Sequence, residues 1–165
     1  MKKLISFAML CMIASLSFGQ VKFSKFKLSK DSPLGCCPGR KMLDFKFTNT
    51  GDKSLKYVNI HYYIVNGVGD VISGAKAATL KVGEEEVVKP RIAQNTGPFE
   101  IGKSYSRWIG GLLYADKKTT VIPHQLEIVY MGENDPVFIT ITKENIATYF
   151  PSVKWIDYNR YNRAL

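Results

Sequence analysis

Two adjacent cysteines, Cys36 and Cys37, are the residues of this chain whose type and spacing best suit chemistry. Such a pair can close a vicinal disulfide, stay as two free thiols, bridge to another chain or bind a soft metal ion such as Cu(I). A disulfide between neighbours is strained, because its Cα atoms lie outside the ordinary separation. Proline and glycine flank the pair at 33–35 and 38–39 and predict an exposed turn. We favour a loop that tolerates two cysteines, with a redox or metal role of Cys36 and Cys37 as the alternative.

Two histidines, His61 and His124, supply the other ligand type that zinc prefers. Together with the cysteine pair they would make four tetrahedral ligands, but their spacing has no zinc-finger pattern. We expect His61 to be a strand residue that has a polar partner or is half exposed. Because Pro123 precedes His124, we expect His124 at the start of a strand. No metal ion or other cofactor is therefore predicted.

The sequence has no motif of a known catalytic centre. It contains neither a Gly-x-Ser-x-Gly elbow nor a His-Glu-x-x-His pair. The carboxylates of Glu84–Glu86 are consecutive, so they alternate across a strand or are solvated in a turn, and do not converge as glycosidase carboxylates do. Asp70 follows Gly69 in a turn-like site, where its expected role is to cap backbone amides. We predict that the protein is not an enzyme.

The first nineteen residues have the layout of a bacterial secretory signal peptide. Lys2 and Lys3 form a basic start, an apolar run follows at 4–13, and mostly small residues fill 14–19. The run is about half of the roughly 20 residues that a membrane-spanning helix needs. We expect cleavage near Gly19-Gln20, which places the protein in the periplasm or at the cell surface and leaves no transmembrane segment. The predicted divisions are 1–19 (signal peptide), 20–142 (β-sandwich domain) and 143–165 (C-terminal aromatic extension).

Positive charge is spread along the whole chain. The formal net charge of +9 falls by two, to +7, when Lys2 and Lys3 are removed with the signal peptide. The remaining basic residues form no dense cluster in the sequence, which is typical of a solvated surface. Together with export, this spread argues against nucleic-acid binding and leaves weak attraction to anionic lipid or polysaccharide.

The elements expected to position these residues are strands. Residues 43–48 alternate apolar and polar side chains, as a half-buried strand does. In the run 55–65, Val58, Ile60, Tyr62 and Ile64 share one face, and Asn66-Gly67 then suits a tight hairpin. Further strands are predicted at 77–82, 87–93 (with Pro90 at an edge or bulge), 105–114, 125–131 and 136–141. Seven or eight short strands separated by turn residues favour an antiparallel sandwich or barrel.

Several landmarks occur in a fixed order along the chain: 49–56, 68–71, Thr96-Gly97-Pro98 with Gly102, Trp108 with Tyr114, and 128–131. Together they resemble a family of small bacterial secreted β-sandwich domains of unknown function. The resemblance covers about residues 44–138 and implies an immunoglobulin-like antiparallel β-sandwich, without implying an activity. The residues whose roles it implies to be structural are Gly69, Asp70, Gly97, Pro98, Gly102, Trp108, Tyr114 and Tyr130. Trp108 is expected in the core between the sheets.

The C-terminal residues are rich in aromatic side chains. Residues 144–150 predict a short helix that Pro151 interrupts, and 152–165 predict a second helical piece with Ser152 as a candidate N-cap. The aromatic residues are Tyr149, Phe150, Trp155, Tyr158 and Tyr161. We expect them to dock on the sandwich. The alternative is a partner-binding segment, because aromatics together with Arg160 are typical of binding hot spots.

These features predict a secreted, non-enzymatic binding or accessory domain. Its candidate binding residues are Trp155, Tyr158, Arg160 and Tyr161, and its partner would be a protein or a cell-envelope polysaccharide. Two alternatives are a thiol or soft-metal protein that acts through Cys36 and Cys37, and a carbohydrate-binding module that uses exposed aromatic side chains.

Overall fold

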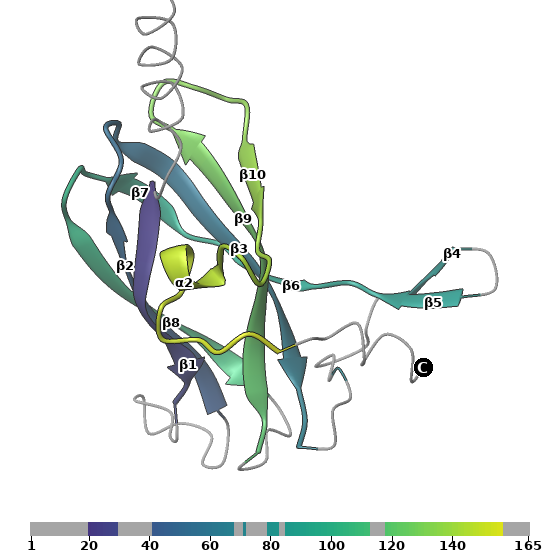
Figure 1. Cartoon of the computed structure of the whole chain (residues 1–165). Helices are drawn as coiled ribbons and strands as arrows, with labels where there is room; N and C mark the ends of the chain where they lie inside the picture. Colours follow the sequence, from purple (N-terminus) through teal and green to yellow (C-terminus); the bar gives the residue numbers. More distant parts are fainter. Residues whose placement is uncertain are drawn as a thin grey trace, which may run out of the picture.

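Two antiparallel β-sheets lie face to face in the computed structural model of the chain (Figure 1). The structure describes residues 20–29, 41–67, 71, 79–82, 85–112 and 118–156. The elements are β1 (Val21–Leu28), β2 (Lys41–Asn49), β3 (Leu55–Val65), β4 (Thr79–Val82), β5 (Glu85–Val88), β6 (Arg91–Ala93), β7 (Thr96–Phe99), β8 (Ser104–Leu112), β9 (Thr120–Tyr130), β10 (Val137–Thr140) and α2 (Ile146–Tyr149). The smaller sheet has the order β1-β2-β8, and the larger has the order β10-β9-β3-β6, with β7 also paired to β3.

The chain passes between the two sheets as it does in immunoglobulin-like sandwiches. β1 and β2 belong to the smaller sheet, β3, β6 and β7 to the larger, β8 again to the smaller, and β9 and β10 to the larger. The predicted all-β, immunoglobulin-like sandwich is therefore confirmed. β4 and β5 pair with one another, and Figure 1 shows this hairpin extending away from the sandwich.

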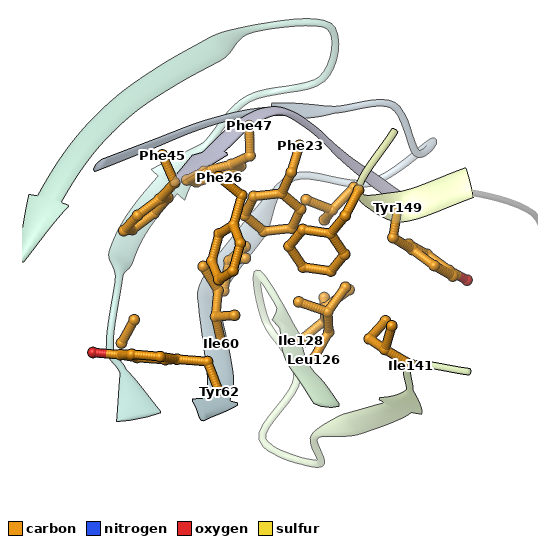
Figure 2. Packing of buried hydrophobic residues seen from close by; sticks show 14 of the residues in the cluster. Phe23, Phe26, Phe45, Phe47, Ile60, Tyr62, Leu126, Ile128, Ile141 and Tyr149 are labelled. Carbon is orange, nitrogen blue, oxygen red and sulfur yellow. The ribbon is translucent and has the colours of Figure 1, made fainter. Parts of the chain in front are cut away.

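The core follows the alternation of apolar residues along the strands. The β3 side chains predicted to share a face, from Val58 to Ile64, are all buried between the sheets. On β9, Leu126, Ile128 and Tyr130 are buried in the same way. Figure 2 shows Phe45 and Phe47 of β2 among the side chains that complete this core. Burial of each large apolar side chain stabilises the fold by about 1.5–3 kcal/mol.

The short helix α2 carries the C-terminal part of the chain into this core. Phe150, directly after α2, is fully buried and stacks on Phe23 with ring centroids 4.4 Å apart. It also meets the edge of Phe26 at 5.0 Å. The side chain of Asn145 holds the start of the helix, since its Oδ1 accepts from the Thr142 N–H and its Nδ2 donates to the Thr140 carbonyl, each at 2.8 Å.

Strand β1 was not predicted from the sequence. Its lysines suggest only a solvated stretch, yet Val21, Phe23 and Phe26 are buried between them. A register shift between Phe23 and Lys25 inserts one extra residue, so strict alternation is lost. The β-bulge is the reason that the period-two pattern is not visible.

Trp108 is not in the core, and the prediction that placed it there is wrong. Its side chain is 49 % exposed on the outer face of β8, while Tyr105 and Ile109 turn inward against the core. Both faces of β8 carry apolar residues, so the sequence does not show which face is inside. The predicted strand 87–93 is likewise two strands, β5 and β6, separated at Lys89-Pro90.

The second C-terminal helix does not begin at Ser152 as predicted. Residues 151–153 form a turn, in which the Val153 N–H donates to the Phe150 carbonyl at 2.9 Å, and residues 154–156 are non-helical. Pro151 cannot supply a backbone donor, which favours the turn over a continued helix. The remainder of the predicted helix, 157–165, lies outside the described residues.

Candidate functional site

A groove of about 510 Å³ opens at one end of the sandwich, where three distant parts of the chain meet. Because β1 and β2 are antiparallel neighbours, the end of β1 and the start of β2 lie at this same end. The beginning of β9 forms a second wall, and the C-terminal segment 152–156 crosses as a third. The lining residues are Phe26, Lys27, Leu28, Ser29, Lys41, Thr119, Thr120, Val121, Ser152, Val153, Lys154 and Ile156.

The described lining of this basic groove is cationic and hydroxyl-rich. Lys27 and Lys41 come from the wall formed by β1 and β2, and Lys154 comes from the C-terminal wall. No aspartate or glutamate is among the described residues that line the groove. Serine and threonine hydroxyls stand between them, at Ser29, Ser152 and 119–120. Ammonium groups attract anions, and hydroxyls both donate and accept hydrogen bonds. The lining therefore suits an anionic ligand that also carries polar groups.

Backbone contacts and core packing hold the groove walls. The Ser29 N–H donates to the Met42 carbonyl at 2.8 Å, and the Met42 N–H donates to Ser29 Oγ at 3.3 Å. The C-terminal wall follows directly after Phe150, which is fixed in the core, and Val153 and Trp155 pack partly against the core. These restraints reduce the conformational entropy that a ligand must remove on binding.

A second polar cluster lies on the outer face of the larger sheet. His61 Nε2 lies 3.3 Å from Glu127 Oε2, and the His124 ring is 5.3 Å from the Tyr63 ring. The prediction that His124 begins a strand is wrong, because it lies inside β9 at a register shift between His61 and Tyr62 of β3. Burial lowers the pKa of His124, and the nearby His61 lowers it further.

The chemistry of this histidine cluster is that of an ion pair or hydrogen bond and not of a metal centre. Within the part of the chain that the structure describes, no group of three His, Cys, Asp or Glu side chains is arranged to hold a metal ion. His61 has Glu127 as its partner, in agreement with the expectation of a strand residue with a polar partner. The cysteine pair predicted as the alternative site, Cys36 and Cys37, lies outside the described residues.

The structure places some of the sequence-predicted landmarks and leaves others outside its description. A Cβ atom at Gly97 would lie 2.6 Å from the Leu55 carbonyl oxygen and 2.6 Å from the Phe99 nitrogen, so only glycine fits there. Gly102 has a φ of +72°, which favours glycine, and Tyr130 is buried. Pro98 lies in β7 and follows a cis peptide bond. Gly69, Asp70, Tyr114, Tyr158, Arg160 and Tyr161 lie outside the described residues.

Sequence reasoning did not find the groove lysines as a site. Lys27, Lys41 and Lys154 are far apart in the chain and have no motif spacing, so they looked like spread surface charge. Of the predicted tail residues, Trp155 is half-buried beside this groove wall and packs against the core. The groove lysines are brought together by the antiparallel pairing of β1 with β2 and by the packing of Phe150 in the core.

No protein-family model, curated protein or solved structure matches the chain. None of the described helices has both the length and the apolar character needed to cross a membrane.

Proposed function

We propose that this chain is a secreted, non-enzymatic binding domain that takes an acidic oligosaccharide in its basic groove. The observation that carries the proposal is that Lys27 and Lys41 of the β1–β2 wall and Lys154 of the C-terminal wall line one groove, without a carboxylate among the described lining residues. The basic and apolar start of the sequence supports export to the periplasm or the cell surface.

The choice of an acidic sugar follows from the mixed chemistry of the groove. Lysines pair with carboxylate or sulfate groups, while Ser29, Ser152 and Thr120 can exchange hydrogen bonds with sugar hydroxyls. The less polar face of a sugar ring can pack on the apolar lining residues, which are Phe26, Leu28, Val121, Val153 and Ile156. The volume is within the range of about 300–1,000 Å³ that is usual for small-molecule sites.

The test measures the affinity of the full mature chain for a galacturonic acid oligomer and for its methyl ester. The ester keeps the hydroxyls and removes the charges, so we expect binding of the acid alone. Each ion pair between a partly exposed lysine and the ligand is worth about 0.5–1 kcal/mol. Replacing Lys27, Lys41 and Lys154 with Gln should therefore lower the affinity by roughly ten- to hundredfold.

A matched control separates the groove from net charge. Replacing Lys22, Lys46 and Lys103 with Gln removes the same charge from exposed positions that do not line the groove. We expect this control to bind within about twofold of the parent at 0.15 M salt. Equal losses in both triple variants, or equal binding of the ester, would show that the groove is not the site.

A further inference from the structure

Among the described strands, β8 lies at one edge of the smaller sheet, and this edge differs from the other edges of the sandwich. β8 is nine residues long, and β2 is its paired neighbour among the described strands. An exposed strand edge presents unpaired backbone N–H and C=O groups, and natural proteins usually protect such edges. The question is whether each edge of this sandwich carries that protection.

The other described strand edges of the sandwich are protected against pairing. β1 has Lys22, Lys25 and Lys27 and a β-bulge, both of which discourage pairing. β10 is four residues long, and the edge formed by β6 and β7 consists of three and four residues and contains Pro98. β8 has no proline, and its pairing with β2 is regular from Ser104 to Ile109, beyond which a register shift between Lys41 and Leu43 of β2 interrupts it. Its edge is therefore regular over residues 104–109.

The hydrogen-bond pattern shows which β8 groups face outward. The Asn49 N–H donates to the Lys103 carbonyl at 3.2 Å, and the Asn49 carbonyl accepts from the Gly102 N–H at 2.8 Å. Because backbone direction alternates along an antiparallel strand, Phe47, Phe45 and Leu43 also turn their backbone groups toward β8. Their partners Tyr105, Arg107 and Ile109 then face β2. The backbone groups of Ser104, Ser106 and Trp108 therefore face the edge of β8 that lies away from β2.

The exposed side chains beside this edge are one large aromatic residue and several basic residues. Trp108 is 49 % exposed, and it lies beside Gly110, where a Cβ atom would be 3.2 Å from Met42 Cε and 4.0 Å from Trp108 Cζ3. Arg107, Lys46 and Lys103 are exposed around the strand. Of the neighbouring acids, Asp44 is paired with Lys25 and Glu100 lies in the turn before β8.

We propose that the β8 edge binds an extended acidic segment of another protein, which adds as an antiparallel or parallel strand beside β8. The outward N–H groups of Ser104, Ser106 and Trp108 and the carbonyls of Ser104 and Trp108 would supply the hydrogen bonds, and Trp108 would cover an apolar side chain of the segment. The Ser106 carbonyl already accepts from Arg107 Nη1 at 3.1 Å. Arg107 and Lys46 favour acidic residues in the partner strand. The same charges disfavour a second copy of this chain, since like charges would face one another across the new pair.

The test uses the full mature chain and a blocked nine-residue peptide of alternating glutamate and valine. We expect NMR shifts and slower amide exchange at Ser104, Ser106 and Trp108, and no such change with the peptide in which lysine replaces glutamate. Ser106→Pro removes one outward N–H and should weaken binding about tenfold. Ser106→Ala keeps that N–H and is the matched control, expected within about twofold of the parent.

Further measurements distinguish a loss of peptide binding at β8 from unfolding of the variant and from binding in the basic groove. Thermal unfolding establishes whether Ser106→Pro is folded, and Trp108→Ala, which leaves the backbone unchanged, should also weaken the peptide complex severalfold. Binding must persist in the Lys27, Lys41 and Lys154 triple variant. Loss of binding in that variant, equal binding of the lysine peptide, or a concentration-dependent dimer that Ser106→Pro abolishes would each overturn the proposal.

Discussion

Strand β2 ends at Asn49 inside a buried hydrogen-bond network and begins at Lys41 in the open basic groove. The Asn49 side chain is fully buried and donates to the Lys53 carbonyl at 2.9 Å and to the Phe99 carbonyl at 3.0 Å. Its Oδ1 accepts from the Gly51 N–H at 3.0 Å. At the opposite end, lysine and hydroxyl side chains face solvent around a cavity. The end of β2 therefore contributes mainly to stability, whereas its beginning contributes to a candidate binding surface.

The largest effect is expected from Phe150→Ala, because this residue joins the core to a groove wall. Loss of its stacking on Phe23 and its contact with Phe26 leaves a cavity, at a cost of about 3–5 kcal/mol in the free energy of unfolding. Denaturant titration measures that loss, and the exposed Phe138→Ala is the control, with an expected change under about 0.5 kcal/mol. A loss below about 1 kcal/mol would separate the C-terminal segment from the core.

Asn49→Ala tests the closed end of β2 alone. It leaves the buried Phe99 carbonyl, the partly buried Lys53 carbonyl and the Gly51 N–H without their side-chain partner, at a cost of about 2–3 kcal/mol. Groove affinity for the acidic oligomer, measured at a temperature where the variant is folded, should stay unchanged. The exposed Asn134→Ala is the control. Reduced affinity in folded Asn49→Ala protein would contradict the separation of the two ends.

The smallest expected effect is a pH dependence of the free energy of unfolding. The folded-state pKa of His124 lies below its ordinary value of 6.5, because burial and His61 disfavour its charged form. The unfolded chain therefore binds more protons below that value, and stability falls as the pH decreases through 6.5. Unfolding titrations at pH 7.5 and pH 5.5 should show a smaller decrease for His124→Gln than for the parent. An equal decrease would assign the acid sensitivity to other groups.

The fold could be predicted from the sequence wherever alternation is regular. The runs that became β2, β3 and β9 have one apolar face each, and turn residues such as Asn66-Gly67 mark their ends. The prediction failed where a local irregularity or a second apolar face interferes. The bulge at Phe23 and Lys25 hides β1, and the apolar residues on both faces of β8 make the position of Trp108 ambiguous.

The candidate site was much harder to predict than the fold. The aromatic residues near the C-terminus made that segment a candidate binding site in the sequence. In the structure, two of these aromatic residues, Tyr149 and Phe150, are buried in the core. The groove depends on three lysines that only the tertiary structure brings together, and isolated lysines have no spacing that distinguishes a site from a solvated surface. The edge position of β8 among the described strands likewise depends on which strands lie beside it, which is a property of sheet order.

The stacking of Phe23 on Phe150 also has a consequence for the order of events during synthesis. The first strand cannot complete its aromatic packing until the chain has been made as far as residue 150, so a nascent chain that has only β1 to β9 exposes Phe23 and Phe26. Contacts of such long sequence separation slow folding. A chain whose first strand stays unpacked until Phe150 has been made remains accessible to chaperones for nearly the whole time of its synthesis.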